Sequence, residues 1–171
     1  MSQKYFPDAN TFLAGWHIYY PPKVFARLWQ ELEKKTEEIA ILQPIMKEIE
    51  PKSSNYGKLS DTKKEEHYPI RRWIEKTGFS IKQIGSEVEA LSIELEKEYQ
   101  IHEQSKGANQ TDILLISYAK FHQGTVVTYE AKQPNRPGKK ENYKIPLICK
   151  EQGVECLTFI EMITKLNIQI K

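Results

Sequence analysis

Four acidic residues are predicted to lie at the same end of a buried sheet, two directly after its strands and two on neighbouring helices. Asp8 directly follows the first of these segments, and Glu130 closes the β-branched run "TVVTYE". Asp112 begins an apolar helical segment, and Glu48 borders the inward stripe of a short one. Ligands collect where parallel strands end, so these carboxylates are expected to meet there. Clustered carboxylates repel one another and call for divalent cations, here Mg²⁺ or Mn²⁺, which act mostly at phosphate groups.

Each of these acids also has a structural interpretation. Asp8 is suited to cap the helix that follows it, and Asp112 is suited to the positive end of its helix dipole. Glu48 and Glu130, taken alone, would be surface residues. Glu50 points further from the inward stripe of its helix, so Glu48 is the preferred candidate. The argument for a site is that all four fall at the same end of the predicted sheet.

Short strands and helices alternate along the chain and must position these acids. The pattern predicts strands at 4–7, 39–43, 125–130 and 154–159. It predicts helices at 9–15, 23–38, 44–51, 69–78, 81–103, 112–123, 145–153 and 160–167. In the helix at 23–38, Val24, Leu28 and Leu32 recur at helical spacing as an apolar stripe. This alternation predicts an α/β sandwich with a mostly parallel sheet.

The size and composition of the chain fit one folded domain with a single core. It has 171 residues, of which 39% are hydrophobic and 28% charged. Residues 52–68 are polar and are expected to form a mobile connection. The whole middle, 52–108, is expected to be purely helical and to cover one edge or face of the sheet.

A local basic stretch at 131–144 is the first candidate for contacting nucleic acid, because the net charge of +2 requires basic residues to be gathered locally. It starts just past Glu130 and is expected to lie over the rim of the pocket. Phosphate contacts there would orient RNA without reading its sequence, whereas the alternative is a solvated loop. Arg71 and Arg72 are a weaker second candidate. The residues expected to bind substrate in the stretch are Lys132, Arg136, Lys139 and Lys140.

Nothing in the sequence points to a membrane or to an exported protein. No apolar stretch approaches the roughly 20 residues that cross a bilayer. The start "MSQKYF" lacks the apolar centre of a signal peptide, and Cys149 and Cys156 match no zinc or redox spacing. The expected location is the cytoplasm.

Several segments, in their order and spacing, resemble the PIN-like domains. These are compact metal-dependent ribonucleases that include the VapC toxins of toxin–antitoxin pairs, and the match is with an uncharacterised prokaryotic subfamily. The segments are "DANTF" at 8–12, "IMKEIE" at 45–50, "TDILLISYAK" at 111–120, "TVVTYE" at 125–130 and "YKIPLICKEQGVECLTFIEMI" at 143–163. The resemblance implies a three-layer sandwich whose central, mostly parallel sheet of four to five strands is flanked by helices. It implies one domain over 1–171 with a helical insertion at about 52–108.

The resemblance also implies roles for individual residues. Asp8, Glu48 and Asp112 would bind the metal, Asn10 would steady the first acid, and Thr128 would lie beside the site.

Two departures weaken the match to the family pattern. The fourth family acid is commonly an aspartate after a threonine, whereas Glu130 is one methylene longer and one position further on. Ala9 replaces a small hydroxyl residue and so removes a hydrogen-bonding group near the metal.

The function implied is a Mg²⁺- or Mn²⁺-dependent endoribonuclease that hydrolyses RNA phosphodiester bonds, as the toxin of a toxin–antitoxin pair. Its partners would be the RNA substrate and a protein antitoxin, and a homodimer is compatible with the resemblance. The rival is a non-catalytic RNA- or protein-binding module that retains the fold, which Ala9 and the displaced Glu130 favour. A small-molecule phosphatase is a third, more distant interpretation.

Overall fold

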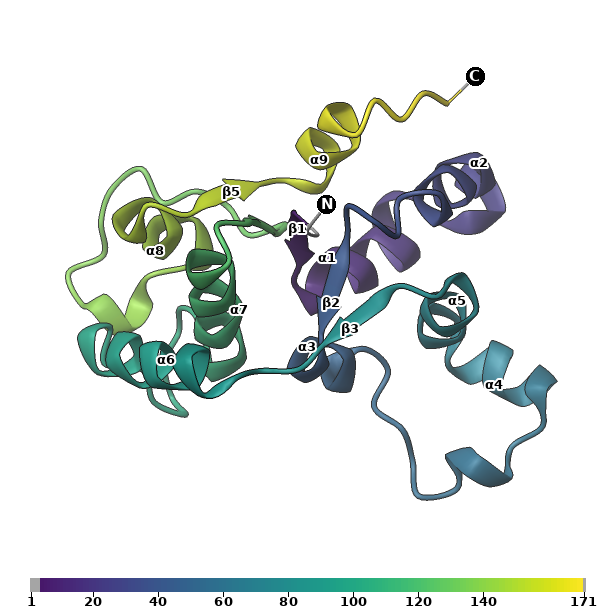
Figure 1. Ribbon diagram of the computed structural model, residues 1–171, viewed down its shortest axis with the longest axis horizontal. Helices are drawn as coiled ribbons and strands as arrows, with labels where there is room; N and C mark the ends of the chain where they lie inside the picture. Colours follow the sequence, from purple (N-terminus) through teal and green to yellow (C-terminus); the bar gives the residue numbers. More distant parts are fainter. Residues whose placement is uncertain (1–3, 171) are drawn as a thin grey trace.

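The computed structural model describes residues 4–170 as an α/β protein with helices on both sides of parallel strands (Figure 1). The strands are β1 (Tyr5–Pro7), β2 (Ala40–Leu42), β3 (Ser80–Lys82), β4 (Thr125–Val127) and β5 (Glu155–Leu157). Every residue of β1, β2 and β4 is buried. Strands buried on both faces need a continuous apolar run, which is why these segments were recognisable in the sequence.

The strands form two sheets, which a single bridge joins edge to edge. β1 pairs with β4 and β4 with β5, while β2 pairs with β3, and every ladder is parallel. A parallel bridge between Tyr5 and Ile39 connects β1 to the residue before β2. The resulting order is 3-2-1-4-5. The chain therefore builds outward in one direction from β1 and later in the other, with the switch point between β1 and β4.

Helices cover both faces of the strands. They are α1 (Ala9–Ala14), the π-helical turn η1 (Gly15–Tyr19), α2 (Pro22–Glu33), α3 (Gln43–Glu48), the 3₁₀ turn η2 (Tyr56–Lys58), α4 (Asp61–His67), α5 (Pro69–Thr77), α6 (Ser86–Glu98), α7 (Gln110–Phe121), the 3₁₀ turn η3 (Lys140–Asn142), α8 (Ile145–Gln152) and α9 (Phe159–Lys165). In Figure 1, α6, α7 and α8 lie on one side of the strands and α1, α2 and α5 on the other. The predicted α/β sandwich with a parallel sheet is confirmed.

The middle of the chain is not purely helical, because β3 lies within it and pairs with β2 in the register Ile41↔Ile81. The predicted helix at 81–103 is therefore too long. Ile81 and Ile84 lie before α6 at the same helical spacing as its apolar residues. This spacing is why the predicted helix began too early in the sequence. In the structure, Gly85 is the N-cap residue, and α6 begins only at Ser86.

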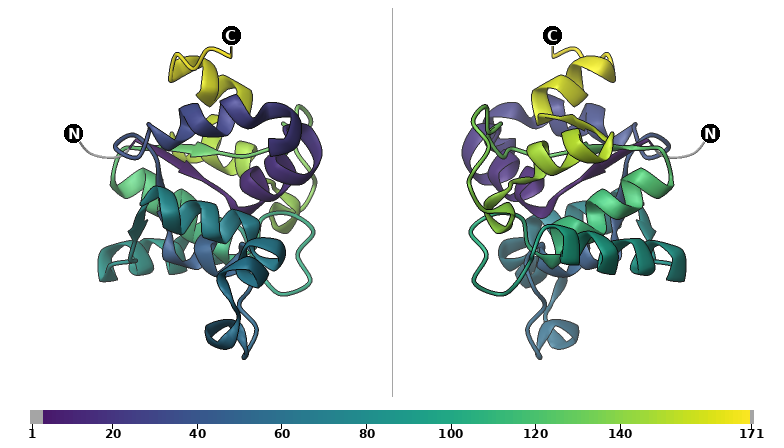
Figure 2. Two further views of the ribbon diagram at one scale, coloured as in Figure 1. Left: turned by 90° about the vertical axis from the view of Figure 1, so that its right-hand side faces the viewer. Right: turned by 90° about the vertical axis from the view of Figure 1, so that its left-hand side faces the viewer.

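The polar segment 52–68 also contains ordered turns that its composition did not predict. It includes η2 and α4, and the Ser60 side chain caps α4 by accepting a hydrogen bond from Lys63 N at 3.3 Å. Both views of Figure 2 show the segment that carries η2 projecting from the rest of the molecule, at the end opposite to α9.

The helix predicted to carry the apolar stripe of Val24, Leu28 and Leu32 is kinked in its first turn. Phe25 has the non-helical angles φ −112° and ψ 35°, which separate the first turn of α2 from the rest. Leu28 and Leu32 are buried as expected, whereas Val24 is 74% exposed. The kink rotates the first turn away from the face that packs on the sheet, so the prediction for Val24 was wrong.

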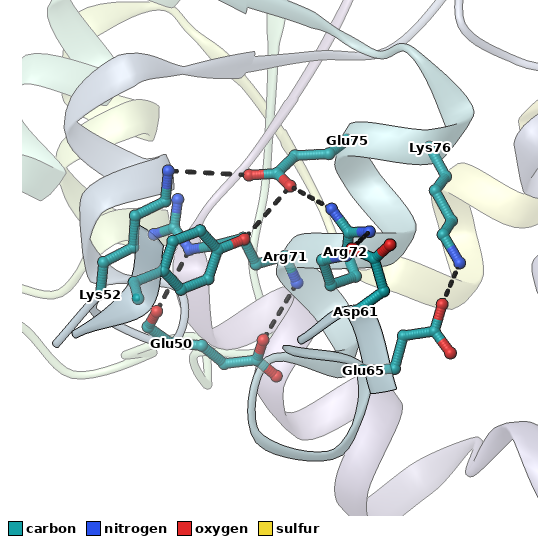
Figure 3. A network of polar contacts seen from close by, with 9 residues as sticks. Glu50, Lys52, Asp61, Glu65, Arg71, Arg72, Glu75 and Lys76 are labelled. Atoms are coloured by element: carbon teal, nitrogen blue, oxygen red, sulfur yellow. Dashed lines mark hydrogen bonds and ion pairs between the residues drawn. The ribbon is translucent and has the colours of Figure 1, made fainter. Parts of the chain in front are cut away.

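Arg71 is a structural residue, contrary to the expectation that it contacts RNA. Its guanidinium is buried and donates to the carbonyl oxygens of Met46 at 2.6 Å, Ile49 at 2.9 Å and Glu50 at 3.2 Å. The Glu50 carboxylate accepts in turn from the backbone N–H groups of Ile70 and Arg71, at 3.1 and 3.0 Å. These reciprocal bonds hold the end of α3 against the start of α5, and Figure 3 shows those between Glu50 and Arg71.

Arg72 lies at the outer edge of the same network. It pairs with Asp61 at 3.2 Å and with Glu75 at 3.4 Å, and Lys76 pairs with Glu65 nearby (Figure 3). These ion pairs tie α4 to α5, so Arg72 already has two acidic partners within the chain.

Gly107 lets the loop before α7 approach the segment before α8. The N–H of Gly107 donates to the Glu141 carbonyl at 3.1 Å, and the N–H of Ala108 donates to the Tyr143 carbonyl at 2.8 Å. A Cβ on Gly107 would lie 2.2 Å from the Tyr143 carbonyl oxygen. Only glycine permits this approach, which sets where α7 begins.

We expect Gly107→Ala to lower the free energy of unfolding by about 1–3 kcal/mol, because the new methyl group forces two backbone segments apart. Gly57→Ala is the matched control, since a Cβ there meets no atom within 4 Å. Urea unfolding of both variants measures the difference. Equal stability of the two variants would contradict the close approach.

Candidate functional site

The four acids that the sequence singled out line one cavity of about 330 Å³. The lining residues are Asp8, Ala9, Asn10, Leu13, Glu48, Asn109, Asp112 and Glu130. We call this the acidic cavity, because four carboxylates and no lysine or arginine line it. Asp8 comes directly after β1, and Glu130 follows β4, the two strands that flank the switch point. The structure thus brings the four together, while their chemical roles stay predictions.

Asp8 is at once a helix cap and the most buried acid of the cavity. Its side chain is fixed by two threonines, and the residue is 4% exposed. Asp8 Oδ1 accepts from the N–H of Thr11 at 2.7 Å and lies 2.6 Å from the Thr11 hydroxyl, and Asp8 Oδ2 accepts from the Thr128 hydroxyl at 2.5 Å. Its backbone N–H donates to the Val127 carbonyl at 2.9 Å. The two interpretations of Asp8 are therefore compatible.

The residue that steadies Asp8 is Thr11 and not Asn10. Asn10 lines the cavity but is exposed, and within residues 4–170 it forms no hydrogen bond with Asp8. Thr11 was missed, although it stands three residues after an aspartate at a helix start, the position whose N–H an N-cap side chain contacts.

Thr128 connects Asp8 to Glu130. Its hydroxyl donates to Asp8 and accepts from the N–H of Glu130 at 3.1 Å. Glu130 itself lies in the loop after β4, which ends at Val127, so the predicted strand at 125–130 was too long. Glu130 Oε2 accepts from the N–H of Ile145 at 2.8 Å, at the first residue of α8.

Asp112 and Glu48 reach the cavity from two different helices. Asp112 forms a capping box with Asn109 at the start of α7, and the two reciprocal hydrogen bonds are both 2.9 Å long. The interpretation of Asp112 as an acid in the first turn of its helix is confirmed, and Asp112 also lines the cavity. Glu48 ends α3, is exposed, and forms no hydrogen bond or ion pair in the described part of the chain.

Burial and, to a smaller extent, neighbouring carboxylates raise the pKa values of Asp8, Asp112 and Glu130. Burial raises the pKa of Asp112 to about 7, and the charges of Glu130, Asp8 and Glu48 add to the effect. Burial also raises the pKa of Asp8, against the hydrogen bonds from Thr11 and Thr128, and Glu48 raises it further. The pKa of Glu130 is raised by burial and by Asp8, against the Ile145 N–H and the charge of Lys144. The ionised forms of these three acids are therefore disfavoured in the cavity, whose lining includes no lysine or arginine.

The donor chemistry of the acidic cavity suits a hard cation, because its ligating groups are oxygen atoms. Among the described residues, no three His, Cys, Asp or Glu side chains stand together as a ready-made ligand set. Binding an ion would therefore require the carboxylates to draw inward. Glu48 has no hydrogen-bond or ion-pair partner to leave among residues 4–170, whereas Asp8 and Asp112 are held by their hydrogen bonds.

None of the four basic residues predicted to bind substrate lines the acidic cavity. Lys132 and Arg136 line a second cavity, and Arg136 pairs with Glu151 at 3.1 Å. Lys139 pairs with Glu141 at 3.7 Å, and Lys140 Nζ lies 5.6 Å from the ring centroid of Tyr99. The two halves of the basic stretch therefore have different surroundings.

Solved structures share this fold at low sequence identity. PAE2754 from Pyrobaculum aerophilum is 13% identical, with a TM-score of 0.56 over 98% of this chain and 91% of that one. VapBC2 from Rickettsia felis, crystallised bound to a DNA fragment from their promoter, is 15% identical, with a TM-score of 0.51 over 90% of this chain and 97% of that one. These neighbours place the chain among proteins with a PIN-like fold.

By sequence, the chain belongs to the family described as Domain of unknown function (DUF4411), whose model matches residues 5–170. No curated protein sequence matches it. In the part of the chain that the structure describes, no helix is long and apolar enough to span a membrane.

The raised pKa of Asp112 predicts how stability depends on pH without metal. Between the ordinary value of 3.8 and about 7, the folded protein holds a proton at Asp112 that the unfolded chain has released. Stability contributed by this group is therefore lost as the pH rises through that window. We expect Asp112→Asn to flatten the decline in free energy of unfolding between pH 4 and pH 7, measured by urea unfolding in chelator.

Asp61→Asn is the control, because Asp61 also lies in the first turn of a helix but outside the cavity. It should leave the decline unchanged. A parent-like pH profile for Asp112→Asn would show that Asp112 does not titrate in this range.

Proposed function

We propose that this protein is a divalent-metal-dependent endoribonuclease. The observation that carries the proposal is the acidic cavity itself, in which four carboxylates from four separate elements line one space at the switch point of the sheet. The PIN-like fold supports the assignment at the level of architecture. Mg²⁺ or Mn²⁺ is the proposed cofactor, because carboxylate oxygens select hard cations.

Asp8, Glu48 and Asp112 are the proposed metal ligands, with Glu130 as a fourth acid. A bound ion would supply an activated water for attack on a phosphodiester and would stabilise the charge of the transition state. The chain's part is to hold the acids in place. The Thr11 and Thr128 hydroxyls fix the carboxylate of Asp8 in one orientation.

The proposed substrate is RNA, and the proposed biological role is that of a toxin blocked by a protein antitoxin. The fold likeness to VapBC2 supports this role. The cytoplasm is the proposed location, because RNA and an antitoxin are both present there. Association into a homodimer is a further prediction from the family resemblance.

The second candidate is a non-catalytic RNA- or protein-binding module with the same fold. Two observations favour it. Glu130 already accepts a hydrogen bond from the Ile145 N–H, and Ala9 offers no hydroxyl beside the acids. A module of this kind would bind RNA or protein without needing a divalent ion.

We expect Asp8→Asn and Asp112→Asn each to lower the rate of Mn²⁺-dependent cleavage of a fluorescent single-stranded RNA by at least about 100-fold, because each removes a charged metal ligand. The chain contains one other aspartate, Asp61, whose side chain is 82% exposed. Asp61→Asn makes the same chemical change outside the cavity and should cleave like the parent. Thermal melts of all three variants confirm that they are folded.

Two results would contradict the proposal. One is cleavage by the parent that persists in chelator, and the other is an equal loss of activity in all three variants. Specific RNA binding by a parent that does not cleave with Mg²⁺ or Mn²⁺ would favour the non-catalytic module.

A further inference from the structure

A second cavity, of about 490 Å³, carries the opposite charge to the acidic cavity. Three of its lining residues are cationic, Lys132, Arg136 and Lys150, and no acid is among them. Its apolar lining includes Pro134, Pro146 and Leu147. We call it the basic cavity. Lys150 lies on α8, outside the basic stretch recognised in the sequence, so only the fold brings the three cations together.

Two of these cations have no ion-pair partner among residues 4–170. In the described part of the chain, neither Lys132 nor Lys150 forms a salt bridge, although the charge of Lys132 helps to lower the pKa of Glu161. Arg136 pairs with Glu151 at 3.1 Å, and its side chain stays 62% exposed. The cavity therefore presents unneutralised positive charge beside an apolar surface, which suits an anion that has an apolar body.

The two cavities share one wall, which consists of the loop after Glu130 and the first turn of α8. Glu130, which lines the acidic cavity, bonds to the N–H of Ile145, and the next two residues of α8, Pro146 and Leu147, line the basic cavity. Lys132 is only two residues from Glu130, which is at most about 7 Å of extended chain.

Gln133 makes this wall rigid. Its side-chain oxygen accepts from the N–H of Lys144 at 2.7 Å, and its side-chain nitrogen donates to the Asn142 carbonyl at 3.0 Å. These bonds fasten the loop after Glu130 to the segment that begins α8. The spacing between the two cavities is therefore set by the fold.

We propose that the basic cavity binds one nucleotide of the RNA strand, next to the phosphate that occupies the acidic cavity. The base would lie against Pro146 and Leu147, and its phosphate would contact Lys132 and Lys150. The volume is within the range of small-ligand pockets. This inference rests on the proposed function and adds that the enzyme holds its substrate in a fixed register. The nearness of the acidic cavity favours a nucleotide over an acidic peptide.

Binding of a labelled eight-nucleotide single-stranded RNA, measured by fluorescence anisotropy in chelator, tests the inference without cleavage. We expect K132Q with K150Q to weaken binding at least 10-fold and to reduce the salt slope by about 0.7, the single-strand value for the one phosphate that both lysines contact. K58Q with K63Q makes the same charge change at two exposed lysines that line neither cavity, and it should weaken binding less than threefold. Equal losses in the two double variants would overturn the inference.

Adenosine monophosphate, titrated into the parent and followed by backbone amide NMR, provides a direct probe. We expect shifts at the amides of residues 132, 133, 135 and 136 and of residues 147–150, larger than those caused by inorganic phosphate at the same concentration. Equal shifts with phosphate, or shifts only elsewhere, would overturn the nucleotide pocket. Normal RNA binding by K132Q with K150Q, together with lost cleavage in Asp8→Asn, would overturn this inference alone. A nucleotide bound here by a protein that never cleaves RNA would overturn only the proposed catalysis.

Discussion

The hydrogen bonding of the buried Asp8 carboxylate is the constraint on which the acidic cavity depends. A carboxylate that is 4% exposed must be satisfied by neighbouring donors, and Thr11 and Thr128 supply them. Thr11 belongs to α1, and Thr128 follows β4, so the same bonds join the first helix to the strand across the switch point. The Thr128 hydroxyl also accepts a hydrogen bond from the N–H of Glu130. The same threonine therefore positions both Asp8 and the loop that carries the fourth acid.

The cavity conflicts with the stability of the fold. Acids that raise one another's pKa values destabilise a folded protein at neutral pH, and most single neutralising substitutions in such a cluster relieve repulsion. The cluster of acids is thus a place where the arrangement of side chains does not favour the stability of the fold. Such places are where functional sites are expected. The Arg71–Glu50 network shows the opposite case, since the buried Arg71 guanidinium donates three hydrogen bonds to backbone carbonyls and holds the end of α3, which carries Glu48.

Local patterns predicted the parts of the site that depend on the chain nearby. Buried apolar runs located β1 and β4, and acids at their ends or at a helix start identified Asp8 and Asp112. Patterns failed where distant segments decide the outcome. β3 needs β2 as its partner, and the basic cavity needs Lys150 to meet Lys132 across the loop. Thr11 was recognisable from capping rules, whereas the bond from Glu130 to Ile145 was not.

The central claim is that the four carboxylates form one electrostatic unit that a divalent ion neutralises. The substitution Glu48→Gln tests this claim most directly, because Glu48 has no hydrogen bond to lose among the described residues. In chelator, this variant should be at least as stable as the parent. Saturating Mn²⁺, at a hundred times its dissociation constant, should stabilise the parent by about 2.7 kcal/mol and the variant by much less. Glu37→Gln, an exposed control on the surface, should behave like the parent. A parent that Mn²⁺ does not stabilise, or a Glu48→Gln variant that is stabilised equally, would contradict the account.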